Sequence, residues 1–125
     1  MAVLPEGTEE FDERRFRALL DLAGPSTALE LTSRLDEDLC HVATALTESE
    51  KPMDQHVLRA QSHVLLAIAG TIGANRLYHL SERLNGLAKA PDAGPVADIL
   101  CEIRALLERL ILYIRLTHAR LAGER

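Results

Sequence analysis

The hydrophobic residues of this chain recur three and four positions apart, which is the spacing of amphipathic α-helices. Glycine, proline and polar residues interrupt this pattern at four places, so the sequence predicts five helical segments. A strict alternation of apolar and polar residues, which would predict a β-strand, extends over no useful length. We expect the helices at residues 9–23, 26–47, 54–69, 73–88 and 96–121.

The interruptions also indicate how individual helices begin and end. Gly24-Pro25 ends the first helix. The hydroxyl of Ser26 or Thr27 can cap the second helix, and Asp54 opens the third. Gly70 to Gly73 forms a tight connection, so the third and fourth helices should pack antiparallel. The segment from Pro91 to Pro95 separates the fourth helix from the last.

Length and composition fit a single helical domain. The chain has 125 residues, and aromatic residues make up only 3% of it, so an aliphatic core of mostly leucine must hold it together. We therefore expect an all-α fold, an antiparallel four-helix bundle of the second to fifth segments. The short first helix would pack across one end. This single domain would span residues 9–122 and follow an N-terminal tail at residues 1–8.

Charge and hydropathy exclude two classes of partner. The net charge of −5 argues against binding to nucleic acid. The N-terminus lacks the basic and apolar regions of a signal peptide. The most apolar late stretch, Leu106 to Leu116, contains three charged residues and is too short to cross a bilayer. The sequence therefore predicts a cytoplasmic protein without a membrane segment.

Neither the cysteines nor the histidines have the spacing of a metal site. Cys40 and Cys101 are isolated on predicted helices, and we expect both to be reduced core residues. Among the five histidines, His56 and His63 share a helix face, but a metal site needs three or four converging ligands. We expect no metal site.

His63 stands out by its position on the third helix. At about 100° per residue it lies roughly 160° from Leu65, opposite a stripe of core positions. That core stripe comprises Leu58, Gln61, Leu65, Ile68, Ala69 and Ile72. The helical neighbours of His63 are Ala60, Ala67 and Gly70, so no large side chain overhangs the ring. Such a histidine is either a solvated surface residue or an imidazole that a partner protein can approach.

The residues around His63 favour the second interpretation. The histidine phosphotransfer (HPt) domain has the pattern H-x-L-K-G, four variable residues, then I/L-G-A-x-x-L. The chain resembles this family, because six residues fall in register without a gap: His63, Leu65, Ile72, Gly73, Ala74 and Leu77. Arg59 stands where many members carry a basic residue. Asn85 stands where the family often has a Gln or Glu that bonds to the imidazole.

Two positions depart from the family pattern. Leu66 replaces a lysine that would hold the phosphoryl oxygens by charge, and Ala67 replaces a glycine that leaves room for the partner. Only Arg59 or Arg76 could supply the missing charge. Leu66 should be half exposed, either as part of an apolar docking patch or as an ordinary leucine at the edge of the core.

The resemblance implies a phosphorelay intermediate. His63 would accept a phosphoryl group from an aspartate of a response-regulator receiver domain, or from a hybrid histidine kinase, and pass it to another regulator. Asn85 would orient the ring, or else be a surface residue beside Gly86. Mg²⁺ would come from the receiver, and the chain would be monomeric.

Two other roles can be compared with this carrier role: a kinase, and an adaptor that does not transfer phosphate. No G-x-G-x-x-G or P-loop is present, so we expect a phosphocarrier without a nucleotide site of its own, not a kinase. The missing lysine and glycine also fit an HPt-like adaptor that binds and sequesters a receiver domain without transferring phosphate.

Overall fold

The protein is almost entirely helical. The computed structural model describes residues 10–89 and 93–124, and within them it contains five helices and no β-strand, only an isolated bridge between Glu50 and Met53. The helices are α1 (Glu13–Ala23), α2 (Pro25–Glu48), α3 (Gln55–Ile72), α4 (Asn75–Leu87) and α5 (Ala93–Gly123). The predicted all-α class is confirmed, with the number and order of helices that the hydrophobic spacing indicated.

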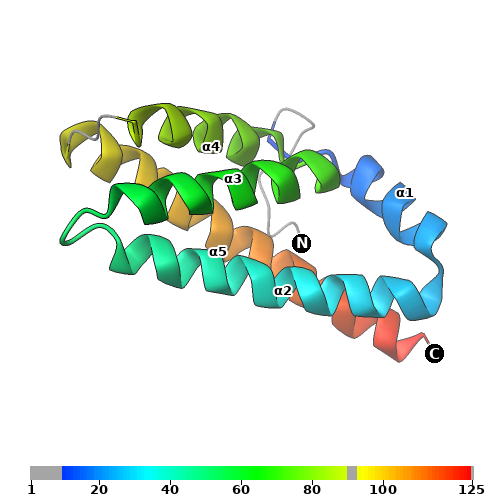
Figure 1. The fold of residues 1–125 in the computed structure, drawn as a ribbon. Coiled ribbons are helices and arrows are strands. Elements are labelled where there is room, and N and C mark those ends of the chain that lie inside the picture. Colours follow the sequence, from blue (N-terminus) through cyan, green and yellow to red (C-terminus); the bar gives the residue numbers. More distant parts are fainter. Residues whose placement is uncertain (1–9, 90–92, 125) are drawn as a thin grey trace.

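Four of the helices form a bundle, and the fifth lies at its end. Helix α3 packs against α4, α4 against α5, α5 against α2 and α2 against α3, so the four close into a ring. Thr32 of α2 meets His118 of α5, while Glu50 after α2 meets Arg104 of α5, so these two helices run in opposite directions. Helix α1 lies where α2 begins and α3 ends, in contact with both (Figure 1).

The core is aliphatic, as the composition predicts. Leucine and isoleucine dominate the fully buried positions, among them Leu39, Leu46, Leu58, Leu65, Ile72, Leu84, Leu100, Ile103 and Ile114. Each such side chain stabilises the fold by about 1.5–3 kcal/mol relative to remaining exposed. The helices thus form a rigid frame on which surface side chains are presented.

An aromatic cluster fixes α1 to α5. The ring of Tyr113 lies 5.3 Å from that of Phe11 and 5.9 Å from that of Phe16, between centroids. The Tyr113 hydroxyl donates a hydrogen bond of 2.7 Å to the Glu13 carboxylate, which lowers the pKa of Glu13. Burial, with that carboxylate, raises the pKa of Tyr113 to about 12. Helix α1 is therefore held by both apolar packing and a hydrogen bond.

The turn between α3 and α4 is built together with the segment before α1. Gly73 has φ of +83°, the left-handed conformation that favours glycine, and it ends α3. The amide of Asp12 donates to the Gly73 carbonyl at 2.8 Å, and the amide of Arg76 donates to the Glu10 carbonyl at 3.1 Å. A Cβ at Gly73 would lie 3.1 Å from the Asp12 backbone oxygen, so a larger residue would be crowded there and also strained by the positive φ.

Four helix boundaries differ from those expected, and one of them is the start of α1, which begins at Glu13 instead of residue 9. Gly70 lies inside α3 rather than in a turn, and the chain reverses only at Gly73. Helix α2 begins at Pro25, with Gly24 before it and no side-chain cap, so Ser26 and Thr27 lie inside its first turn instead of ahead of it. Proline is tolerated at the first helical position because its missing N–H would have no partner there. Helix α5 begins at Ala93, since proline is tolerated in a first turn.

Other boundaries agree closely. The Asp54 carboxylate accepts a hydrogen bond of 3.1 Å from the Val57 amide, so its predicted capping role is confirmed. Helix α1 ends at Ala23, directly before Gly24, as expected, but it begins at Glu13 with Asp12 as its cap. The predicted tail at residues 1–8 lies outside the described residues.

The cysteines do not both lie in the core. Cys40 is half-buried on α2, whereas Cys101 is exposed on α5, so the expectation of two core cysteines was wrong for Cys101. Position 101 follows the fully buried Leu100 and falls on the outward side of α5. None of the helices in residues 10–89 and 93–124 is long and apolar enough to cross a membrane.

Candidate functional site

His63 projects from the exposed side of α3. The buried positions of this helix are Leu58, Ser62, Leu65, Ala69 and Ile72, spaced alternately four and three apart. This stripe is rotated from the expected one, because Gln61 and Ile68 are only half-buried while Ser62 is fully buried. Helix α4 packs on the Ser62 side. The His63 side chain nevertheless remains exposed, as helical arithmetic predicted.

Little surrounds the His63 ring. Ala60 and Ala67 are exposed and Gly70 is half-buried, so these three neighbouring positions carry at most a methyl group, whereas Arg59 and Leu66 are larger. A Cβ added at Gly70 would lie 3.6 Å from the Tyr78 ring, an ordinary contact. Within residues 10–89 and 93–124 the imidazole makes no hydrogen bond or ion pair. A partner can therefore reach a ring nitrogen without displacing another side chain.

Asn85 lies against α3 beside His63, but its contact is with a different residue. Its Oδ1 accepts a hydrogen bond of 3.3 Å from the hydroxyl of Ser62. The same hydroxyl donates to the carbonyl of Arg59 at 2.8 Å. The bond from the imidazole to Asn85 that the family resemblance implied is not formed. Sequence reasoning missed Ser62, although the four-three spacing from Leu58 to Ile72 includes it.

The two candidate phosphate-binding arginines lie on different sides. Arg59 is exposed one helical turn before His63, and no ion pair engages its side chain within the described residues. Arg76, in the first turn of α4, pairs with Glu102 of α5 at 3.0 Å and so reaches toward α5. Leu66 is half-buried beside the site, as expected. Arg59 is therefore the arginine that the structure brings together with His63.

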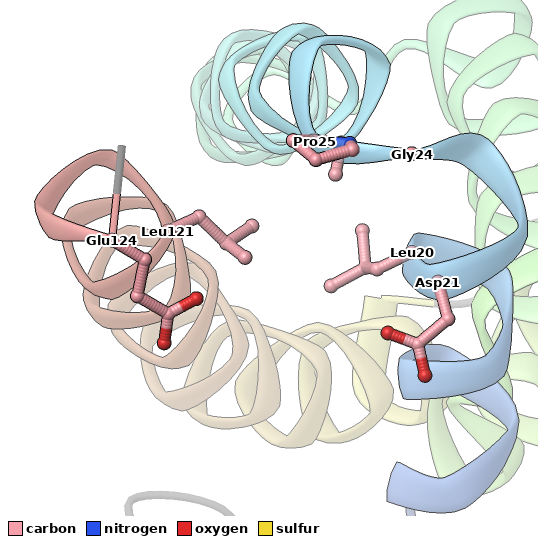
Figure 2. Close-up of a pocket in the computed structure, with 7 residues that line it drawn as sticks. Leu20, Asp21, Gly24, Pro25, Leu121 and Glu124 are labelled. Carbon is pink, nitrogen blue, oxygen red and sulfur yellow. The ribbon is translucent and has the colours of Figure 1, made fainter.

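A cavity of about 310 Å³ lies elsewhere, near the junction of α1 and α2. Leu20 and Leu121 point toward each other across it (Figure 2), and the carboxylates of Asp21 and Glu124 belong to its lining. His63 is not among the residues that line it. This cavity has the size of a small-ligand site, and leucine side chains and two acidic residues line it.

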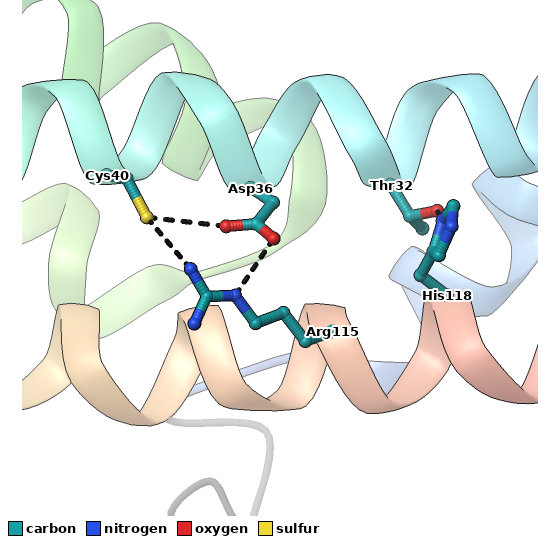
Figure 3. Close-up of polar contacts among 5 residues, drawn as sticks. All are labelled: Thr32, Asp36, Cys40, Arg115 and His118. Atoms are coloured by element: carbon teal, nitrogen blue, oxygen red, sulfur yellow. Dashed lines mark hydrogen bonds and ion pairs between the residues drawn. The ribbon is translucent and has the colours of Figure 1, made fainter.

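The other notable polar cluster joins α2 to α5 (Figure 3). Arg115 donates to Asp36 at 2.9 Å and to the sulfur of Cys40 at 3.3 Å, and the Cys40 thiol donates to Asp36. The bond from Arg115 lowers the pKa of Asp36. Burial, followed by the Asp36 carboxylate, raises the pKa of the Cys40 thiol. A thiol in this state is a poor nucleophile.

The same contact between α2 and α5 contains a second histidine. Thr32 is fully buried, and its hydroxyl lies 2.8 Å from Nδ1 of His118. No group of three or more His, Cys, Asp and Glu side chains in residues 10–89 and 93–124 is arranged to hold a metal ion. His118 is thus tied into the helix contact, in contrast to His63.

Comparison with protein-family models, with curated proteins and with solved structures found no match for this chain. The site is accordingly interpreted from its own residues and geometry.

Proposed function

We propose that the chain is a phosphorelay intermediate in which His63 accepts and passes on a phosphoryl group. The observation that carries this proposal is the exposed, unpartnered imidazole of His63, bordered by Ala60, Ala67 and Gly70 on a helix fixed in a bundle. The resemblance to the HPt motif around the same residue supports it independently of the geometry.

In the proposed transfer, the bundle needs only to present the His63 imidazole to the receiver. A neutral ring nitrogen attacks the phosphorus of an aspartyl phosphate, a P–N bond forms, and the P–O bond to the carboxylate breaks. The aspartate leaves as a carboxylate, and the ring then carries the phosphoryl group. A ring nitrogen can attack only when it carries no proton, and imidazole is the side chain that exchanges its proton most readily near neutral pH. Phosphoryl transfer depends chiefly on alignment and charge neutralisation, and the receiver supplies Mg²⁺.

The sequestering adaptor is the second candidate, favoured by the electrostatics of the site. Leu66 brings no charge, and the ion pair with Glu102 directs Arg76 toward α5. Arg59 alone would then neutralise the phosphoryl oxygens. An adaptor needs no such neutralisation, because it would only bind the receiver through the exposed surface around His63.

Phosphotransfer from a receiver separates the two candidates. The full chain is mixed with Mg²⁺-loaded, phosphorylated receiver domains from the same genome, and base-stable, acid-labile label is followed on it. The variant His63→Gln should lose the label. His56→Gln is the matched control. His56 is exposed on the same helix, so the chain with this substitution should still take up label on His63. Binding to a receiver without label on the native chain would establish the adaptor instead.

A further inference from the structure

Ser62 occupies an unusual place for a hydroxyl, since it is fully buried directly beside the exposed His63. Its proton is shared between two acceptors, the Arg59 carbonyl at 2.8 Å and Asn85 Oδ1 at 3.3 Å. In an α-helix the Arg59 carbonyl is also the acceptor for the His63 amide. Ser62 therefore links Asn85 of α4 to the turn of α3 that carries His63.

This link determines which end of the Asn85 amide is available. A side-chain amide has an acceptor oxygen and a donor NH₂ on opposite sides of one planar group. Because Ser62 engages the oxygen, the NH₂ group at the other end of the amide is left available to a further acceptor. Within residues 10–89 and 93–124 the Asn85 side chain makes no other hydrogen bond.

We propose that Ser62 holds Asn85 so that its NH₂ group donates a hydrogen bond to the phosphoryl group carried by His63. This inference rests on the proposed function. The role is opposite in polarity to the one that the family resemblance implied, in which the side chain accepts from the imidazole. It replaces part of the binding capacity lost with Leu66, because hydrogen bonds to an ionised phosphoryl oxygen are stronger than those between neutral groups. Asn85 acts on the phosphoryl group, and Ser62 is a positioning residue.

Chemical phosphorylation tests this inference without any receiver. Phosphoramidate transfers its phosphoryl group to a histidine nitrogen and releases ammonia. Cleavage after Arg59 and Arg76 yields the peptide 60–76, in which His63 is the only histidine, so its phosphorylation is measured by mass spectrometry at neutral pH. The half-life of the phosphohistidine is then compared between the native chain and its variants.

The expected results follow from the donor role. Asn85→Asp puts an acceptor with negative charge in place of the NH₂ and should shorten the half-life about tenfold, the loss of one charged hydrogen bond. Ser62→Ala should shorten it in the same direction by a smaller factor. Ser81→Ala is the matched control, because Ser81 is also fully buried and bonds to a helix carbonyl, that of Leu77. It should leave the half-life unchanged.

A second readout excludes a merely structural effect. In ¹H–¹⁵N spectra the Asn85 side-chain NH₂ signals should shift when His63 is phosphorylated, and this shift should weaken in Ser62→Ala. Unchanged half-lives in Asn85→Asp and Ser62→Ala, or Asn85 signals that ignore phosphorylation, would overturn the inference. Failure to label His63 would overturn both proposals. A half-life effect without transfer from any receiver would overturn the proposed function alone.

Discussion

Two helix contacts each place a histidine near the surface, one between α2 and α5 and the other between α3 and α4. They differ in how many polar side chains bond around that histidine. The first is cross-linked by polar side chains: Thr32 with His118, Asp36 and Cys40 with Arg115, and Glu50 with Arg104. Across the second, Ser62 bonds to Asn85, and Gln55 bonds to the Lys89 carbonyl. His118 belongs to the cross-links, whereas His63 stands outside them.

This difference shows that availability depends on neighbours rather than on residue type. His118 faces a buried hydroxyl 2.8 Å away, so its ring orientation is set by the fold. His63 has the small residues Ala60, Ala67 and Gly70 beside it, and within the described residues no side chain bonds to its ring. Polar side chains thus link α2 to α5, whereas small residues surround His63 on α3. The imidazole of His118 is thereby part of a helix contact, whereas that of His63 is accessible.

Replacing each of the two histidines by glutamine, in separate variants, gives the largest expected effect. His63→Gln should abolish phosphorylation by a receiver and leave the thermal midpoint nearly unchanged, because the side chain contacts little. His118→Gln should retain phosphorylation and lower the thermal midpoint. Phosphotransfer assays and thermal denaturation measure the two outcomes. A large loss of stability in His63→Gln would contradict the exposed placement of the ring.

The next largest effect concerns the stability of the contact between α2 and α5. Thr32→Val keeps the shape of the side chain but leaves Nδ1 of His118 without its partner, which should cost about 1–3 kcal/mol of unfolding free energy. Thr71→Val is the matched control in α3, where the exposed hydroxyl bonds only to the Ala67 carbonyl. It should change stability by less than about 0.5 kcal/mol. Equal losses in urea denaturation would mean that His118 is not held by Thr32.

Charge at the His63 site can be restored by a single substitution. Leu66→Lys places a cation three residues after His63 and should lengthen the phosphohistidine half-life or speed transfer several-fold, if Arg59 alone neutralises the phosphoryl group. Label decay and single-turnover transfer measure this change. Arg83→Leu is a control that alters an exposed cation on α4. An unchanged half-life and rate in Leu66→Lys would show that another group already supplies the charge.

The smallest effect is a pH dependence confined to the contact between α2 and α5. Arg115 lowers the pKa of Asp36, so this carboxylate stabilises the folded state above its ordinary pKa of about 4. That contribution is lost as the pH falls through the lowered value. Arg115→Gln should therefore be less stable than the native chain at pH 7, with the difference disappearing in strong acid. Arg59→Gln should show no such pH-dependent difference in denaturation curves.

The helices could be predicted from the sequence because hydrophobic spacing is a local property. Their order and most of their ends follow from residues such as Gly24 and Asp54, which act within one turn. Gly70 was misplaced because a glycine permits a turn without requiring one. The real turn at Gly73 depends on Asp12, which lies about sixty positions earlier and approaches only after folding. No local pattern contains that contact.

The candidate site was predicted in part for a similar reason. The exposure of His63 followed from its angle to Leu65, but the burial of Ser62 depends on where α4 packs. A small polar residue gives no hydrophobic signal, so the pairing of Ser62 with Asn85 became visible only in three dimensions. Arg76 likewise stood close to His63 in the sequence, yet its ion pair with Glu102 directs it to α5.

The backbone bonds that join Glu10 and Asp12 to the turn at Gly73 have a consequence for biosynthesis. The ribosome releases these early residues long before it has made Arg76, whose amide completes the contact. Phe11 and Phe16 must wait still longer for Tyr113, close to the end of the chain. Until then, Phe11 and Phe16 lack the Tyr113 ring that packs against them in the folded chain. Helix α1 is thus synthesised well before the residues that complete its packing.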